Sequence, residues 1–156
     1  MVRAVIQRVT RARVAWRQGL IDHAHEIGPG VVVLLAVAGT DSDSDAHRMA
    51  DRIVTLRIFN GAQSKSAHSL LDAAGEAMVV PQFTLYADSS RGRRPSFLGA
   101  APPGHAQPLF ELFCRRLESR VAVKRGGFGA HMELSLVNDG PFTLILDSAD
   151  KAGPDG

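Results

Sequence analysis

An unbroken apolar run, Val31–Val37, constrains the fold of this chain more than any other feature. The run is rich in β-branched residues and follows the turn-forming sequence Gly28-Pro29-Gly30. It predicts a strand covered on both faces, because a strand with one face in water alternates apolar and polar residues. It is far too short to cross a bilayer. The chain therefore needs a sheet with packed side chains on both sides of this strand.

Further strands are predicted on both sides of that run. Val5, Val9, Val14 and Trp16 lie in short β-prone segments, and we expect hairpin turns at Gly19 and at Gly28–Gly30. Downstream, the patterns indicate strands over residues 77–86, 132–136 and 142–146, with a loop over 87–97.

Two segments have helical spacing. Residues 40–45 offer several N-cap candidates for a helix that buries Ala46, Met49, Ala50 and Ile53. A second helix is expected from about His105 to about Arg120, with its apolar stripe at Leu109, Leu112, Phe113 and Leu117. Two helices against mostly antiparallel strands predict an α+β fold. We expect one domain over residues 1–147 and a disordered tail over 148–156.

Composition excludes several classes of protein. Hydrophobic residues make up 45% and charged residues 22%, as in ordinary globular proteins. A single cysteine, Cys114, excludes an intramolecular disulfide framework, and no signal-peptide pattern precedes the first strand, so we expect a cytoplasmic protein. The net charge of +2 permits an RNA partner without requiring one. Arginines gather near the N-terminus and at positions 91, 93 and 94, which solvated surfaces would also explain.

Metal and nucleophile sites find little support. Residues 41–45 begin like a calcium loop, but Ala46 stands where glycine is required and Arg52 where the bidentate glutamate belongs. His23 and His25 share one face of a strand without a third ligand nearby in the sequence, so no metal is expected. Cys114 lies on the apolar side of the second helix, as a core thiol does.

Three segments call for more than composition. Pro81 interrupts a β-prone run and would leave the amides of Gln82, Phe83 and Thr84 free. Residues 138–143 form a turn whose Gly140-Pro141 bond can be cis. Residues 126–132 lead three glycines and Phe128 into a strand. Each segment alone is also explained by a tight turn.

Taken in order, these segments resemble the D-aminoacyl-tRNA deacylase family. The resemblance runs from residue 2 to about 147 and is carried by residues 2–9, 51–59, 81–88 with 92–97, and 127–143. It implies a barrel-like α+β body that forms a homodimer, acts on the aminoacyl-tRNA 3′ end and needs no cofactor or metal. Gly140-Pro141 of one subunit would enter the pocket of the other as a cis chiral filter that rejects L-amino acids and admits glycine. Arg8 would clamp that loop.

The same resemblance assigns the site residues. Gln82, Phe83 and Thr84 would be catalytic, and Pro81, Phe128, Met132 and Asn138 would bind the substrate. The ester of an aminoacyl-tRNA has a neighbouring ribose hydroxyl, so the enzyme mainly needs to position water and stabilise an oxyanion. The backbone amides of Gln82 and Phe83 would suffice as the oxyanion donors. Thr84 is the one hydroxyl in the loop, and we interpret it as a positioning residue rather than a nucleophile.

Two residues depart from the family pattern. Serine usually stands at the position of Pro81, and a small aliphatic residue at the position of Phe142. A paralogous branch that clears a misplaced L-amino acid has Pro-Gln in the first motif and an aromatic residue in the second. Arg8 and the Gln-Phe-Thr sequence resemble the D-selective branch, which we favour. The alternatives are L-selective editing and a non-catalytic protein that binds the tRNA end.

Overall fold

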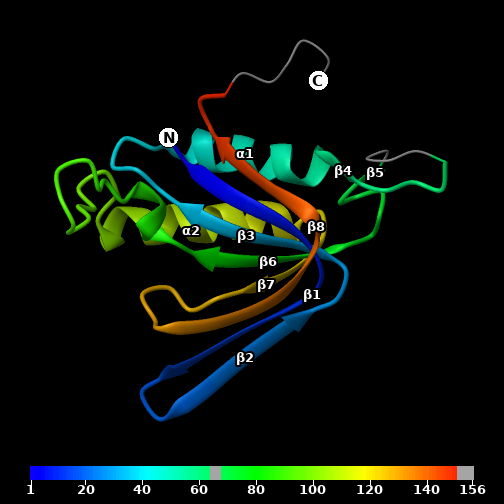
Figure 1. The fold of residues 1–156 in the computed structure, drawn as a ribbon, viewed down its shortest axis with the longest axis horizontal. Coiled ribbons are helices and arrows are strands. Elements are labelled where there is room, and N and C mark those ends of the chain that lie inside the picture. The colour runs from blue at the N-terminus through cyan, green and yellow to red at the C-terminus, as the bar shows by residue number, and fades with distance from the viewer. Residues whose placement is uncertain (64–67, 151–156) are drawn as a thin grey trace.

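The Val31–Val37 run forms the strand on which the rest of the sheet is arranged (Figure 1). The computed structural model describes residues 1–63 and 68–150. In it, β3 (Gly30–Ala36) is buried along nearly its whole length, as its composition predicts. It pairs antiparallel with β1 (Arg3–Gln18) and parallel with β6 (Glu76–Pro81), which in turn pairs parallel with β7 (Ala122–Arg125). The sheet is therefore mixed.

The long strand β1 joins the two halves of the sheet. Along one edge it pairs antiparallel with β8 (Met132–Asp147), and along the other with β2 (Ile21–Ile27) and then β3. The hairpin turn predicted at Gly19 is confirmed by its positive φ of 62° between β1 and β2. The hairpin predicted at Gly28–Gly30 is wrong, because β2 and β3 follow one another along the same edge of β1.

Two helices cover one face of this sheet, as predicted. These are α1 (Asp43–Thr55) and α2 (Pro103–Glu118), which begins two residues before the expected His105 because proline suits the first turn of a helix. The acidic residues at the start of α1 include a capping box, in which the Asp45 carboxylate accepts hydrogen bonds from the Ser42 amide and hydroxyl. Smaller elements are β4 (Arg57–Phe59), β5 (His68–Ser69) and the 3₁₀ helix η1 (Phe83–Tyr86).

Two apolar cores result from this arrangement. One lies between the helices and the sheet, and its largest fully buried side chains include Phe113, Met49 and Leu117. The other lies inside the curled sheet, between the β1–β2 hairpin and strands β3, β6 and β8, and contains Val14, Met78 and Val80. The sheet is nearly closed into a barrel, so the α+β prediction is confirmed.

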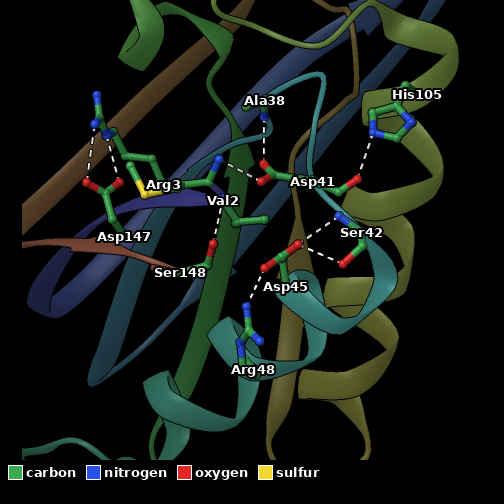
Figure 2. Close-up of polar contacts among 11 residues, drawn as sticks. Val2, Arg3, Ala38, Asp41, Ser42, Asp45, Arg48, His105, Asp147 and Ser148 are labelled. Atoms are coloured by element: carbon green, nitrogen blue, oxygen red, sulfur yellow. Dashed lines mark hydrogen bonds and ion pairs between the residues drawn. The ribbon is translucent and has the colours of Figure 1, made fainter. Parts of the chain in front are cut away.

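Polar contacts join the ends of β1 and β8 and connect the segment before α1 to α2 (Figure 2). The Val2 amide donates to the Ser148 hydroxyl at 3.0 Å, and the Ser148 amide donates to the Val2 carbonyl at 2.8 Å. His105 Nε2 lies 3.0 Å from the Asp41 carbonyl. Residues 148–150 are thus held by hydrogen bonds, whereas residues 151–156 of the predicted tail lie outside the described residues. Within the described ranges, no helix is long and apolar enough to span a membrane.

Candidate functional site

A cavity of about 630 Å³ opens where the parallel strands β3 and β6 end. Its walls come from these strand ends, from the start of α2 and from the segment that joins β7 to β8. The lining is almost wholly apolar, and Gln82 and His131 are the polar side chains in it. No carboxylate, thiol or side-chain hydroxyl lines this cavity in the described part of the chain. Five of the predicted site residues line it together: Pro81, Gln82, Phe83, Phe128 and Met132.

Pro81 ends strand β6 at the cavity. Strand β7 pairs with β6 only as far as Val79, while β3 pairs as far as Pro81. Successive amides of a strand point to opposite sides, and the Gln82 amide donates to β3. The Pro81 nitrogen therefore faces the β7 side, where β7 no longer pairs with β6. The missing proline N–H therefore removes no ladder hydrogen bond. The strand predicted over residues 77–86 is wrong beyond Pro81, because the chain turns there into η1.

The backbone amides after Pro81 have two different environments. The Gln82 amide donates to the Leu35 carbonyl at 2.8 Å, so the expectation that this amide is free to hold an oxyanion is wrong. The amides of Phe83 and Thr84 open the 3₁₀ helix and have no acceptor among the described residues. The first amides of a helix have no intrahelical partner, which makes them available to an anion. Phe83 lines the cavity with 58% of its surface exposed.

The Thr84 hydroxyl is engaged within its own loop. The Gln82 side-chain amide donates a hydrogen bond to it, and no histidine in the described ranges contacts it. Thr84 is exposed and does not line the cavity. These surroundings provide no base to activate the hydroxyl as a nucleophile.

The glycine-rich segment 126–131 begins beside Pro81, and its residues 128–131 line the cavity. A Cβ at Gly126 would lie 2.7 Å from the Met132 sulfur, and one at Gly127 would lie 2.5 Å from the Trp16 indole nitrogen. Only glycines allow this close approach. The packing brings Phe128 into the cavity wall, where its ring lies 5.8 Å from that of Phe110. His131, at the rim of this wall, was not identified from the sequence.

The second predicted motif forms a bulge in β8 rather than a turn between two strands. The pairing of β1 with β8 shifts between Gln7↔Thr143 and Val9↔Asn138, which leaves residues 139–142 protruding. The Gly140-Pro141 peptide is cis, as predicted. Gly140 and Pro141 are exposed.

Arg8, on β1, holds this bulge in place through its side chain. Its Nε donates to the Asp139 carbonyl at 2.9 Å and its Nη1 to the Ile58 carbonyl at 2.5 Å. The guanidinium lies 4.6 Å from the centre of the Phe142 ring, and its Nε is 3.3 Å from the Asp139 carboxylate. Arg8 itself is buried. These contacts connect the bulge to β1 and to β4.

Asn138 fastens the bulge from within. Its side-chain amide donates to the carbonyls of Arg8 and Phe142, each at 2.9 Å. A Cβ at Gly140 would lie 2.2 Å from the Phe142 nitrogen and 2.5 Å from the Asn138 amide oxygen, so the bulge has no room for a side chain at position 140. None of Arg8, Asn138, Gly140 and Pro141 lines the cavity of their own chain.

Other titratable groups lie apart from the site. His23 and His25 contact the Trp16 ring, with a centroid distance of 5.0 Å for His23. Among the described residues, no group of three or more histidine, cysteine or acidic side chains is arranged to hold a metal. Burial raises the pKa of the Cys114 thiol to about 12, so this thiol stays protonated at neutral pH.

Comparisons with known proteins agree on one family. A family model described as D-Tyr-tRNA(Tyr) deacylase matches residues 5–147. The D-aminoacyl-tRNA deacylase of Roseiflexus sp. (strain RS-1) is 48% identical, over 95% of this chain and 94% of that protein. That of Thermus aquaticus is 46% identical, over 97% and 99%.

Two solved structures have the same fold. The structure titled "c-Myc DNA Unwinding Element Binding Protein" matches with a TM-score of 0.84 and 34% identity, over 93% of this chain and 97% of that one. A probable eukaryotic D-amino acid tRNA deacylase matches with a TM-score of 0.80 and 20% identity, over 94% and 98%. At that lower identity the likeness concerns the fold alone.

Proposed function

Because this chain belongs to the D-Tyr-tRNA(Tyr) deacylase family, we propose that its cavity receives the 3′ end of a D-aminoacyl-tRNA and hydrolyses the ester there. The products are the free D-amino acid and tRNA. Glycine mischarged on tRNA-Ala is a second proposed substrate, because glycine has no side chain for a chiral filter to exclude. The observation that carries the proposal is that the amides of Phe83 and Thr84, at an apolar cavity, have no acceptor among residues 1–63 and 68–150.

The proposed chemistry relies on the backbone. Attack of water on the ester carbonyl puts negative charge on the carbonyl oxygen, and the amides of Phe83 and Thr84 donate hydrogen bonds to it. Each such donor lowers the barrier by roughly 3 kcal/mol in other oxyanion holes. The neighbouring ribose hydroxyl helps to position the water, so no side-chain nucleophile is needed. The Gln82 side chain, through its hydrogen bond to Thr84, keeps the loop in shape.

Substrate selection is proposed to need a second subunit. Residues 139–142 protrude, are held by Arg8 and Asn138, and lie outside the cavity of their own chain. In a homodimer, Gly140-Pro141 of the partner subunit would enter the cavity and leave no space for an L side chain. Pro81, Phe128 and Met132 would then surround the substrate from within the chain.

An assay on three charged tRNAs tests the proposal. We expect fast release of D-tyrosine from D-Tyr-tRNA and of glycine from Gly-tRNA-Ala, and slow release of L-alanine from L-Ala-tRNA. Fast cleavage of L-Ala-tRNA alone would assign the chain to L-selective editing. Tight binding of all three tRNAs without hydrolysis would assign it to the non-catalytic class.

Sedimentation of the same preparation tests the dimer. A monomer that still hydrolyses D-Tyr-tRNA at its full rate would contradict the proposed contribution of the partner subunit.

A further inference from the structure

An arginine-rich loop projects from the rim of the cavity. Residues 89–95, here named the arginine loop, contain Arg91, Arg93 and Arg94 and no acidic residue. Their neck is a pair of backbone hydrogen bonds between Asp88 and Ser96, at 2.8 and 2.9 Å. The two ends of the loop are therefore side by side, and the three arginines lie on a short loop that is closed at its base.

The neck of this loop is continuous with the cavity wall. Phe97, directly after the neck, lines the cavity and packs edge to face on Phe83 at a centroid distance of 5.2 Å. Phe83 carries one of the two amides proposed to hold the oxyanion. A loop of this length extends at most about 12 Å beyond its neck. The arginine loop therefore begins one residue away from a side chain that lines the cavity.

The three guanidinium groups have no partner in the described parts of the chain. Arg91, Arg93 and Arg94 are exposed, and none makes a hydrogen bond or ion pair there. By contrast, nine other arginines each have a carboxylate within 4.0 Å: Arg3, Arg8, Arg13, Arg17, Arg48, Arg52, Arg116, Arg120 and Arg125.

The acidic residue at the neck does not neutralise them. The Asp88 carboxylate accepts a hydrogen bond from the Ser90 amide at 2.9 Å, inside the loop's own turn. Gly92 has a positive φ of 142° and sets the bend between Arg91 and Arg93. The loop therefore presents concentrated positive charge beside an apolar cavity. Proteins that bind single-stranded nucleic acid place positive charge along the path of the phosphate backbone in this way. Here the path would lead to a 3′ end inside the cavity.

We propose that the arginine loop binds backbone phosphates of the tRNA acceptor strand next to the aminoacylated nucleotide. This inference depends on the proposed function and specifies how its substrate is held. Arginine suits the task, because its planar fork can donate two hydrogen bonds to one phosphate. The contacts neutralise phosphates and carry no base information, so the loop contributes affinity to every tRNA alike.

The test compares a substrate that has phosphates with one that has none. The variant Arg91→Ala/Arg93→Ala/Arg94→Ala is assayed on D-Tyr-tRNA and on the D-tyrosyl ester of adenosine. We expect KM for D-Tyr-tRNA to rise roughly tenfold to a hundredfold with kcat little changed, and kcat/KM for the adenosine ester to stay within about twofold. The slope of log KM against log salt should fall by about 2 to 3. Replacing the same three arginines by lysine should restore most of the affinity.

A matched triple variant separates this site from overall charge. Arg13→Ala/Arg17→Ala/Arg116→Ala removes the same charge from surface residues that already have carboxylate partners, and it should leave KM nearly unchanged. Equal losses in the two triple variants would overturn the proposal. So would an equal loss on the adenosine ester, because that would place the effect in the cavity.

Binding of uncharged tRNA, followed by fluorescence anisotropy, distinguishes failure of this inference from failure of the proposed function. An inactive wild-type protein whose affinity for tRNA still falls in the loop variant would refute the function and keep the loop as a phosphate site. Equal affinities of the wild-type protein and the loop variant for uncharged tRNA would refute the loop as a phosphate site, whatever the activity of either protein.

Discussion

Arg8→Ala should lower the free energy of unfolding by about 4 kcal/mol. The Arg8 guanidinium donates to two carbonyls, of Ile58 and Asp139, and each charge-assisted hydrogen bond contributes about 1.5 kcal/mol. Its position over the Phe142 ring adds about 1 kcal/mol. The ion pair with the Asp139 carboxylate adds little, because that side chain is 53% exposed and water screens the attraction.

Urea denaturation of the variant beside a neighbouring control measures this effect. Arg11→Ala is the control, since Arg11 lies on the same strand, is exposed and makes no side-chain hydrogen bond or ion pair in the described ranges. It should change stability by less than about 0.5 kcal/mol. Arg8→Lys should recover part of the loss, because an ammonium group cannot reach both carbonyls as the guanidinium fork does. A loss below about 1 kcal/mol for Arg8→Ala would refute the view that Arg8 holds the bulge.

The same variant also tests the proposed filter. If Arg8 fixes residues 139–142 for a partner subunit, Arg8→Lys should narrow the ratio of kcat/KM between D-Tyr-tRNA and L-Ala-tRNA. The change should appear at temperatures where the variant is fully folded. An unchanged ratio in a stable dimer would separate the bulge from chiral selection.

Four further outcomes follow from the site. Thr84→Ala should lose roughly tenfold to a hundredfold in kcat/KM, whereas loss of a nucleophile is far larger; an acyl group trapped on Thr84 in mass spectra would contradict this. Gly140→Ala should destabilise the bulge, because its Cβ would lie 2.2 Å from the Phe142 nitrogen, and melting temperatures measure it. Exhaustive chelation should leave the rate unchanged, and restoration of a lost rate by one divalent ion would refute that. Burial raises the pKa of the Cys114 thiol from 9.0 to about 12, so the folded state binds this proton more tightly than the unfolded state does. The free energy of unfolding should therefore fall as the pH rises above 9, and it should fall less steeply in Cys114→Ala.

Much of the fold could be predicted from the pattern of apolar residues. The buried strand β3 and both helices follow directly from β-branched composition and helical spacing. The wrong predictions concern places where the backbone changes direction or pairing partner while the residue types stay the same. Gly28–Gly30 has hairpin chemistry but joins two strands along one edge of β1, since only the pairing partner decides between the two.

The site was harder to predict in detail. The motifs around Pro81 and Gly140 lie at the two places where the sheet is interrupted. Proline and glycine favour such interruptions, so the sequence predicts both. Which amides remain free is a different matter. The Gln82 amide donates to the Leu35 carbonyl because β3 extends farther along β6 than β7 does. The residues around Gln82 do not predict how far a distant strand extends.

If backbone amides hold the oxyanion, as proposed, the effects of mutation differ from those in a site built from side chains. Side-chain changes at Thr84 leave the N–H donors in place, so they affect the reaction by moving the loop, whereas changes at Phe83 also alter the cavity wall. The positions that define the loop's course lie elsewhere: Pro81, which ends β6, and Leu35, whose carbonyl anchors residue 82. The side chains that matter most for activity should therefore be those that shape the backbone, and variants at Pro81 should change kcat more than variants at Thr84.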